Sequence, residues 1–169
     1  MTENVILVDQ NDNQVGIMEK LEAHQTGKLH RAFSIFVFNQ KQELLIQKRA
    51  DSKYHSGGLW TNTCCSHPRP DETLDEATHR KLQEEMGFDC RLHHQFYFIY
   101  TADFENGLRE NELDHVFFGR FEGPPKLNKE EACDWRFMDL MQLQKEIEEN
   151  PTSFTAWLKI ALPKVQNIR

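Results

Sequence analysis

The segment Phe33–Phe38 (FSIFVF) constrains the fold of this chain more than any other stretch. Its residues are apolar on both faces of an extended strand, as in a strand at the centre of a sheet. A polar turn at 39–43 follows, and Leu44-Leu45-Ile46 begins a second strand that continues to Lys48 and Arg49. The chain is therefore expected to build its core around a sheet.

Further strands and helices are expected on both sides of this segment. The best helix signal is Asp71–Met86, which has a Thr73-x-x-Glu76 capping box and Gly87 directly after its end. Two helices are predicted near the C-terminus, Leu140–Glu149 and Phe154–Leu162, the second ending or kinking at Pro163. The remaining strands are expected at Val5–Val8, Val15–Met18, Leu59–Ser66, Phe96–Phe104, Glu110–Phe121 and Trp135–Met138.

This order of elements predicts an α/β (α+β) fold, a mixed sheet flanked by helices, as one domain over residues 1–169. The chain has 20 basic and 27 acidic residues, a formal net charge of −7. This acidic balance argues against a general nucleic-acid or membrane surface. No apolar stretch is long enough to span a bilayer, so no membrane insertion is expected.

The cysteines and the N-terminal residues indicate in which cellular compartment the protein is expected. The four cysteines, two of them adjacent at Cys64 and Cys65, are too few for a disulfide framework and are expected to be reduced. Residues 1–4 carry neither a positive charge nor an apolar signal region. We therefore expect a cytoplasmic protein, and a monomer because no exposed apolar stripe stands out.

Strand parity groups several residues that could bind a metal. Residues two apart on a strand share a face, so Cys65 and His67 point the same way and Cys64 points the opposite way. Glu110 and Glu112 likewise share a face. With two upstream histidines they would give a first-row divalent metal a nitrogen and oxygen shell: His24, His30, His67, Glu110 and Glu112. Alternatively, the eight histidines cluster by chance and Glu-x-Glu is a solvated strand face.

The predicted helix ends in a second chemical motif. The run Arg80–Phe88 (RKLQEEMGF) resembles the end of a Nudix box, and Glu72 stands where that motif has an earlier glutamate. Such glutamates hold Mg²⁺ against a diphosphate. The sequence departs from the motif at Lys81, where a glutamate is usual, and at Ser66, where a glycine is usual. The alternative is a solvated acidic helix.

Three segments together carry a more specific resemblance. Trp60–Pro68 (WTNTCCSHP), Glu110-Asn111-Glu112 and Leu29–Ser34 (LHRAFS) closely resemble motifs of the type 1 isopentenyl-diphosphate isomerases, a family with the Nudix fold. The resemblance runs from about Val5 to Trp157, in matching order and spacing. It implies interconversion of isopentenyl and dimethylallyl diphosphates, by adding a proton at C4 and removing one from C2.

The resemblance also implies roles for individual residues. Cys65, as a thiolate, and Glu112 become the catalytic pair, with Tyr100 as a relay and Trp157 facing the cation. The histidine and glutamate cluster becomes the site of one metal, Mn²⁺, Zn²⁺ or Mg²⁺, and Glu85 becomes a ligand of a Mg²⁺ on the diphosphate. The basic residues expected at the diphosphate are Lys20, Arg49, Lys53, Arg80 and Lys81.

Other interpretations stay open from the residues alone. Cys65 could be a core thiol, and Trp157 and Tyr100 could be core aromatics, because their neighbours have core spacing. A Nudix hydrolase of a diphosphate substrate is the main alternative function. A non-catalytic diphosphate- or metal-binding module is the third.

Overall fold

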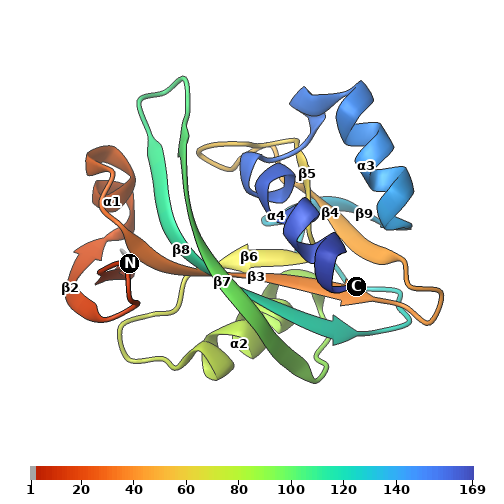
Figure 1. Cartoon of the computed structure of the whole chain (residues 1–169), viewed down its shortest axis with the longest axis horizontal. Helices are drawn as coiled ribbons and strands as arrows, with labels where there is room; N and C mark the ends of the chain where they lie inside the picture. Colours follow the sequence, from red (N-terminus) through yellow and green to blue (C-terminus); the bar gives the residue numbers. More distant parts are fainter. Residues whose placement is uncertain (1–2) are drawn as a thin grey trace.

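The computed structural model describes residues 3–169 (Figure 1). This part of the chain forms a nine-stranded mixed sheet, four α-helices and one short 3-10 helix. In chain order the elements are β1 (Asn4–Val8), β2 (Gln14–Glu19), α1 (Lys20–Thr26), β3 (His30–Phe38), β4 (Leu44–Arg49), β5 (Trp60–Thr61), β6 (Cys64–Ser66), α2 (Leu74–Met86), β7 (Leu92–Asp103), β8 (Arg109–Arg120), β9 (Ala132–Met138), α3 (Leu140–Glu149), η1 (Pro151–Ser153) and α4 (Ala156–Ile168).

The strand β3 is the centre of the sheet, as its apolar sequence predicts. It pairs in parallel with β8 from His30↔Glu112 to Phe38↔Arg120, and antiparallel with β1, β4 and β6. The long strands β7 and β8 form an antiparallel hairpin, and β9 pairs with β4. The predicted mixed sheet is confirmed.

Side-chain alternation along β3 divides the core between the two faces of the sheet. Phe33, Ile35 and Val37 pack in one cluster with Leu82 and Met86 of α2. The alternate residues Phe36 and Phe38 pack in a second cluster with Trp157, Leu158 and Leu162 of α4. Figure 1 shows α2 on one side of the sheet and α3 and α4 on the other. Both faces are therefore covered, which is why β3 tolerates apolar residues throughout.

The caps of α2 confirm the helix signals, although the helix begins at Leu74 rather than Asp71. The Thr73 hydroxyl accepts from the Glu76 backbone N–H, and the Glu76 carboxylate accepts from Thr73 in return. Gly87 ends the helix in the left-handed conformation, with φ of 70°. These caps fix both ends of the helix that carries Lys81 and Glu85.

The single strand predicted over Leu59–Ser66 is wrong, because two short strands with different partners occur there. β5 pairs with β4 and β6 pairs with β3. Between them, the Thr63 hydroxyl donates to the Leu45 carbonyl and accepts from the Val37 N–H. A side chain thus replaces part of the ladder between β3 and β4 and lets the chain change partners.

The C-terminal helix also differs from the prediction, since α4 starts at Ala156 and continues past Pro163 to Ile168. Pro163 is exposed, so water can solvate the carbonyl that loses its helical partner. Buried residues on both sides of it, Leu162 and Val165, hold the helix against the sheet. None of the helices in the described residues is both long and apolar enough to cross a membrane.

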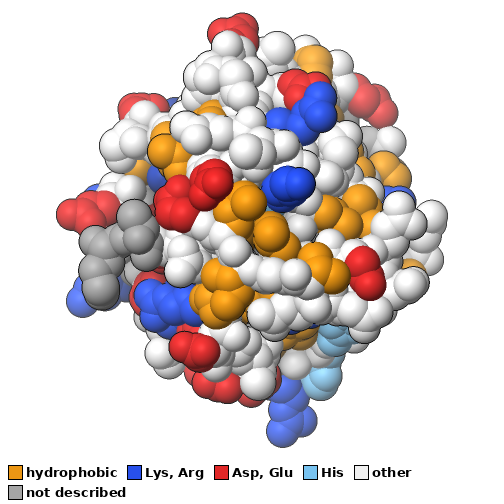
Figure 2. All heavy atoms as spheres, turned by 90° about the vertical axis from the view of Figure 1, so that its left-hand side faces the viewer, with side chains coloured by type: hydrophobic (Ala, Val, Ile, Leu, Met, Phe, Trp, Pro, Cys, Tyr) orange, Lys and Arg blue, Asp and Glu red, His pale blue; other side chains and the backbone are white. Residues whose placement is uncertain are grey.

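The left-hand side of Figure 1, where β2 and α1 lie, exposes apolar side chains among charged ones (Figure 2). Val15 and Ile17 of β2 and Leu21 of α1 are exposed. We expected no exposed apolar stripe from the sequence, and these side chains show that this expectation is wrong at β2.

Candidate active site

One cavity gathers most of the residues singled out from the sequence. Those that line it are Lys20, Arg49, Lys53, Cys65, His67, Lys81, Glu85, Tyr100, Glu110, Glu112 and Trp157. His24 and His30 lie completely buried against Glu112. We call the buried end of this site the floor, meaning His24, His30, Cys65, His67, Tyr100, Glu110, Glu112 and Trp157. We call the four cationic side chains the rim, meaning Lys20, Arg49, Lys53 and Lys81.

The β7–β8 hairpin supplies the two carboxylates of the floor. Glu110 and Glu112 lie two apart on β8, so both project to the same side of the sheet. Tyr100 is opposite Glu112 in the register of β7. Its hydroxyl lies 2.7 Å from Glu112 Oε1 and 3.1 Å from Glu110 Oε1. One phenol therefore ties the two carboxylates together through their Oε1 atoms and leaves their Oε2 atoms to face the histidines.

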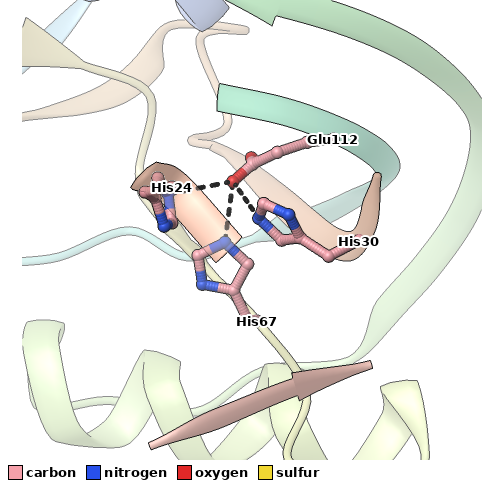
Figure 3. A group of neighbouring side chains, drawn as sticks. All are labelled: His24, His30, His67 and Glu112. Carbon is pink, nitrogen blue, oxygen red and sulfur yellow. Dashed lines mark hydrogen bonds and ion pairs between the residues drawn. The ribbon is translucent and has the colours of Figure 1, made fainter. Parts of the chain in front are cut away.

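Three histidines from three separate segments converge on Glu112 (Figure 3). The distances from Glu112 Oε2 to the three Nε2 atoms are 2.7 Å for His67, 3.0 Å for His30 and 3.8 Å for His24. Although burial alone raises it, His67 and His30 hold the pKa of Glu112 well below its usual range. The carboxylate of Glu112 is therefore ionised at neutral pH.

The backbone orients two of these imidazoles. His24 Nδ1 lies 2.7 Å from the Lys20 carbonyl and His30 Nδ1 lies 2.8 Å from the Lys28 carbonyl. A carbonyl only accepts, so each Nδ1 is the protonated nitrogen and each Nε2 presents a lone pair when the ring is neutral. Burial lowers the pKa of His24 and that of His67, the latter to about 4, so both rings are neutral at pH 7.

The donor set suits a divalent metal ion. His24 Nε2 is buried and has no hydrogen-bond partner. A lone pair buried without a partner is costly, and a cation between it and the Glu112 carboxylate would satisfy both groups. Imidazole nitrogen with carboxylate oxygen is a shell for first-row divalent metals. The group His24, His30, His67 and Glu112, whose ligand atoms lie within 4.8 Å of one another, could therefore hold such an ion.

Cys65 faces this cavity, while Cys64 lies in the apolar cluster under α2, the opposite-face arrangement that strand parity predicts. The Cys65 thiol donates to Asn62 Oδ1 at 3.1 Å, and the Trp157 indole N–H donates to Cys65 Sγ at 3.1 Å. Burial, together with Asp114, raises the pKa of Cys65 to about 12. This shift favours the thiol, and the thiolate that the resemblance implies for the reaction stays a prediction.

Trp157 is both a core residue and a residue of the cavity wall. It belongs to the apolar cluster under α4 and it also lines the cavity. The guanidinium of Arg49 lies over its ring, 5.0 Å from the centroid. The helical spacing that indicated a core residue was correct, and it did not exclude contact with the cavity.

The rim concentrates positive charge at the open end. Lys20 pairs with Glu3 at 3.3 Å, Lys53 with Glu131 at 2.7 Å and Lys81 with Glu85 at 3.3 Å. The fourth cation, Arg49, donates to the His55 carbonyl at 3.2 Å, and its Nε is buried without a partner. A buried guanidinium N–H without an acceptor, among three lysines, favours an anionic ligand here.

The structure does not bring Arg80 to this cavity. Its guanidinium forms a bidentate pair with Glu72, at 2.5 and 2.7 Å, and a longer contact with Glu84. Helical geometry explains the difference, because Arg80 and Lys81 are adjacent and project about 100° apart around α2. Glu85 lines the cavity beside Lys81 and Gln47, outside the histidine group.

His55 is the main residue of the cavity that the sequence did not indicate. It comes from the loop between β4 and β5, is 8% exposed and stacks on Phe104 with ring centroids 4.5 Å apart. Its Nε2 lies 3.7 Å from Glu110 Oε2. No periodicity or motif marks a loop position of this kind, so only the fold reveals it.

Comparison with known proteins adds to this geometry. Residues 28–158 match the family model described as the NUDIX domain. Isopentenyl-diphosphate Delta-isomerase 2 of Aromatoleum aromaticum is 52% identical over 169 residues, covering 100% of this chain and 89% of that protein. Isopentenyl-diphosphate Delta-isomerase 2 of Photorhabdus laumondii is 52% identical over 159 residues, covering 94% and 90%.

Solved structures agree with this chain in fold. A crystal structure of a Deinococcus radiodurans protein has a TM-score of 0.80 at 18% identity, covering 96% of this chain and 98% of that one. A MutT NUDIX hydrolase from Burkholderia pseudomallei has a TM-score of 0.63 at 18% identity, covering 81% and 98%. At these identities the likeness concerns the fold alone.

Proposed function

This chain belongs to the NUDIX family and, within it, to the isopentenyl-diphosphate Delta-isomerases, and on that premise we propose that it interconverts isopentenyl diphosphate and dimethylallyl diphosphate. The observation that carries the proposal is one cavity with a thiol and a hydrogen-bonded carboxylate at its floor and four cations at its rim. A cationic end and a buried end match a substrate that has a diphosphate head and a short apolar tail.

The reaction moves a double bond from C3=C4 to C2=C3. It needs one proton added at C4 and one removed from C2, and it passes through tertiary cationic character at C3. We assign the two proton transfers to Cys65 and to Glu112, the latter with Tyr100 as its relay. The pair holds one transferable proton, which each reaction moves from one member to the other, and the roles exchange for the back reaction.

The resting protonation of the pair sets the order of events. The sequence-based assignment has Glu112 donate to C4 and Cys65 accept from C2, which requires the proton on the Glu112 side. Because burial raises the pKa of Cys65, we place the resting proton on the thiol in this scheme, and it must first move toward Glu112 and Tyr100. Trp157, which donates to Cys65 Sγ, lies where its indole face can stabilise the cation, and the buried floor excludes the water that would quench it.

Two divalent ions complete this proposal. The residues that would hold the first are His24, His30, His67, Glu110 and Glu112, with Mn²⁺, Zn²⁺ or Mg²⁺ as candidates. When bound, such an ion would supply positive charge that fixes and acidifies the groups around Glu112. A Mg²⁺ on the diphosphate would use Glu85, a carboxylate that lines the cavity beside the rim.

The rim residues bind and orient the diphosphate in this scheme. The Arg49 guanidinium offers a fork of N–H donors, and Lys20, Lys53 and Lys81 add point charges around it. Each lysine is now paired with a carboxylate, so the diphosphate must replace those contacts. The diphosphate is bound but its phosphorus atoms are not attacked, so its function in this scheme is to position the substrate.

A single experiment tests the function against the hydrolase alternative. The protein is incubated with isopentenyl diphosphate and Mg²⁺ in D₂O and followed by NMR, with inorganic phosphate measured in parallel. We expect the dimethylallyl isomer, and carbon-bound deuterium in product and recovered substrate. Release of phosphate or pyrophosphate without deuterium on carbon would instead identify a hydrolase.

We further propose that the chain acts as a monomer in the cytoplasm. Floor and rim are complete within one chain, and the four cysteines are free. Size-exclusion chromatography with light scattering tests the oligomeric state. A dimer mass at micromolar concentration would contradict the monomer.

A further inference from the structure

A buried amide lies directly beside the Cys65 thiol. Asn62, in the segment between β5 and β6, is completely buried, and its Oδ1 accepts the Cys65 thiol hydrogen at 3.1 Å. Its Nδ2 donates to the backbone carbonyls of Ile35 and Cys64, at 3.1 and 3.2 Å. Because a carbonyl only accepts, these two bonds fix which way the amide faces, with Oδ1 toward the sulfur. The backbone of β3 and β6 therefore sets the position of that oxygen.

Two threonines continue this contact to the start of α4. The Leu158 N–H donates to Thr155 Oγ1 at 3.4 Å, which is the N-cap bond of α4. The hydroxyls of Thr155 and Thr61 lie 2.9 Å apart, and Thr61 Oγ1 donates to Asn62 Oδ1 at 2.9 Å. Since the one hydrogen of Thr61 goes to Asn62, the hydrogen between the two hydroxyls comes from Thr155. The donors therefore all run in one direction, from α4 to Asn62.

The same chain of hydrogen bonds returns to α4 through the sulfur. Trp157, in the first turn of α4, donates its indole N–H to Cys65 Sγ at 3.1 Å. Ser34 Oγ lies farther from the sulfur, at 3.8 Å, and is bonded at 2.7 Å to Asp114 Oδ2. The sulfur is thus held between an amide oxygen and an indole N–H. We call this closed set the thiol network, meaning Thr61, Asn62, Cys65, Thr155 and Trp157.

We propose that Asn62 is a positioning residue for the proton transfer at Cys65, with Thr61 as its support. The amide lies outside the cavity lining, whereas Cys65 lines the cavity. Asn62 therefore takes the thiol hydrogen on the protein side and leaves another side of the sulfur toward the substrate. A misplacement of about 1 Å can cost about 10²-fold in rate. The inference rests on the proposed function for its effect on turnover, and on the thiol network alone for the contact itself.

A matched pair of variants at Thr61 provides the first test. Thr61→Val keeps the shape of the side chain and removes the hydroxyl, so the Asn62 oxygen loses one of its two donors. We expect kcat to fall by about tenfold with KM unchanged, because the rim is untouched. Thr61→Ser keeps the hydroxyl and should restore kcat to near the wild-type value. Steady-state kinetics of isomerisation measures both.

Thr63→Val is the control for a general loss of packing. Thr63 is as buried as Thr61, and its hydroxyl makes two hydrogen bonds, to the backbone of Leu45 and of Val37. It lies outside the thiol network, so Thr63→Val should lose stability and keep kcat and KM. If it does not fold, as judged by circular dichroism, Thr78→Val takes its place. That variant removes the hydroxyl bond from the buried Thr78 to the backbone of α2.

The S–H stretching band in the Raman spectrum tests the contact without catalysis. Each protein is compared with the same protein carrying Cys65→Ala, and the difference isolates the Cys65 band. A thiol that donates a hydrogen bond stretches at a lower frequency than a free thiol. Asn62→Ala removes the acceptor and should move the Cys65 band to higher frequency. This measurement also decides if Thr61→Val does not fold.

Three results would overturn the proposal. They are a wild-type kcat in folded Thr61→Val, an equal fall of kcat in Thr63→Val, and an unchanged Cys65 band in Asn62→Ala. Failure of the proposed function is distinguishable, because wild type would then form no dimethylallyl diphosphate. The Raman comparison would still show whether Asn62 holds the thiol.

Discussion

The floor and the rim of the cavity differ in how deeply their charged and polar groups are buried and in what those groups bind. In the floor, His24 and His30 are completely buried and are held by backbone carbonyls and by Glu112. In the rim, Lys20 and Lys53 keep 25% and 23% of their side chains exposed and pair with carboxylates at the mouth. The floor is already desolvated and fixed, whereas the rim is partly solvated and carries contacts that a ligand must exchange.

This difference assigns the two regions to different parts of the proposed reaction. Burying charged and polar groups costs folding free energy, and that cost is tolerated where the fixed geometry serves a proton transfer. The pairs of Lys20 and Lys53 are partly exposed and contribute little stability, so a diphosphate can replace them at low cost, whereas the Lys81–Glu85 pair is buried. Changes in the floor should therefore lower kcat, and changes in the rim should mainly raise KM.

The largest effect is expected at the thiol. Cys65→Ala removes one member of the proton-transfer pair and should lower kcat by about 10³-fold or more. Cys64→Ala is the matched control, since Cys64 is the neighbouring thiol but lies in the apolar cluster under α2. It should cost about 1 kcal/mol of stability and leave kcat unchanged. Steady-state kinetics on both variants check this, and full activity in Cys65→Ala would remove the thiol from the mechanism.

Variants of Glu112 and of His24 should differ in whether added metal restores their activity. Glu112→Gln removes an acid–base group and should lower kcat by about 10²- to 10⁴-fold at any metal concentration. His24→Ala removes only a ligand and should weaken metal affinity by about 10- to 100-fold. Excess metal should therefore restore His24→Ala in part and leave Glu112→Gln inactive. Rescue of Glu112→Gln to wild-type turnover would make Glu112 a ligand only.

The rim prediction concerns Arg49. Arg49→Lys keeps the charge but loses the planar fork of donors, so KM should rise by about tenfold while kcat changes little. Lys48→Ala, one residue earlier on β4 and outside the cavity lining, is the control and should leave KM unchanged. A large fall in kcat with constant KM in Arg49→Lys would place the arginine with the floor, next to Trp157.

The sequence predicted those elements whose signals are local. The central strand follows from six residues, and the ends of α2 follow from a capping box and one glycine. The short helix α1 was missed because it has seven residues and buries only Ala23 and His24, too few for a helical period. The break between β5 and β6 depends on Thr63 bonding to two distant strands, which no local pattern encodes.

The candidate site shows the same limit. Motifs of matched spacing indicated Cys65, His67, Glu110 and Glu112, because Glu110 and Glu112 lie on one strand and His67 directly follows the strand that carries Cys65. His55 was missed because its position depends on Phe104, 49 residues further along the chain, and on Glu110. The raised pKa of Cys65 could not be predicted because the sequence does not show how deeply the thiol is buried or that Asp114 lies nearby.

The smallest effect is expected on the outer side of α2, where the sequence grouped Arg80 with the rim. Arg80→Ala should leave KM unchanged and lower the free energy of unfolding by about 0.5–1 kcal/mol, because solvent screens its pair with Glu72. The hydrogen bond from Arg80 lowers the pKa of Glu72 below its ordinary 4.5. In the unfolded chain that pKa is higher, so the stabilisation is complete above about pH 4.5 and is lost as the pH falls through the lowered value. The free energies of unfolding of wild type and Arg80→Ala, measured with denaturant, should therefore differ at pH 7 and converge in acid. A tenfold rise in KM of Arg80→Ala would instead show that Arg80 binds the diphosphate with the rim residues.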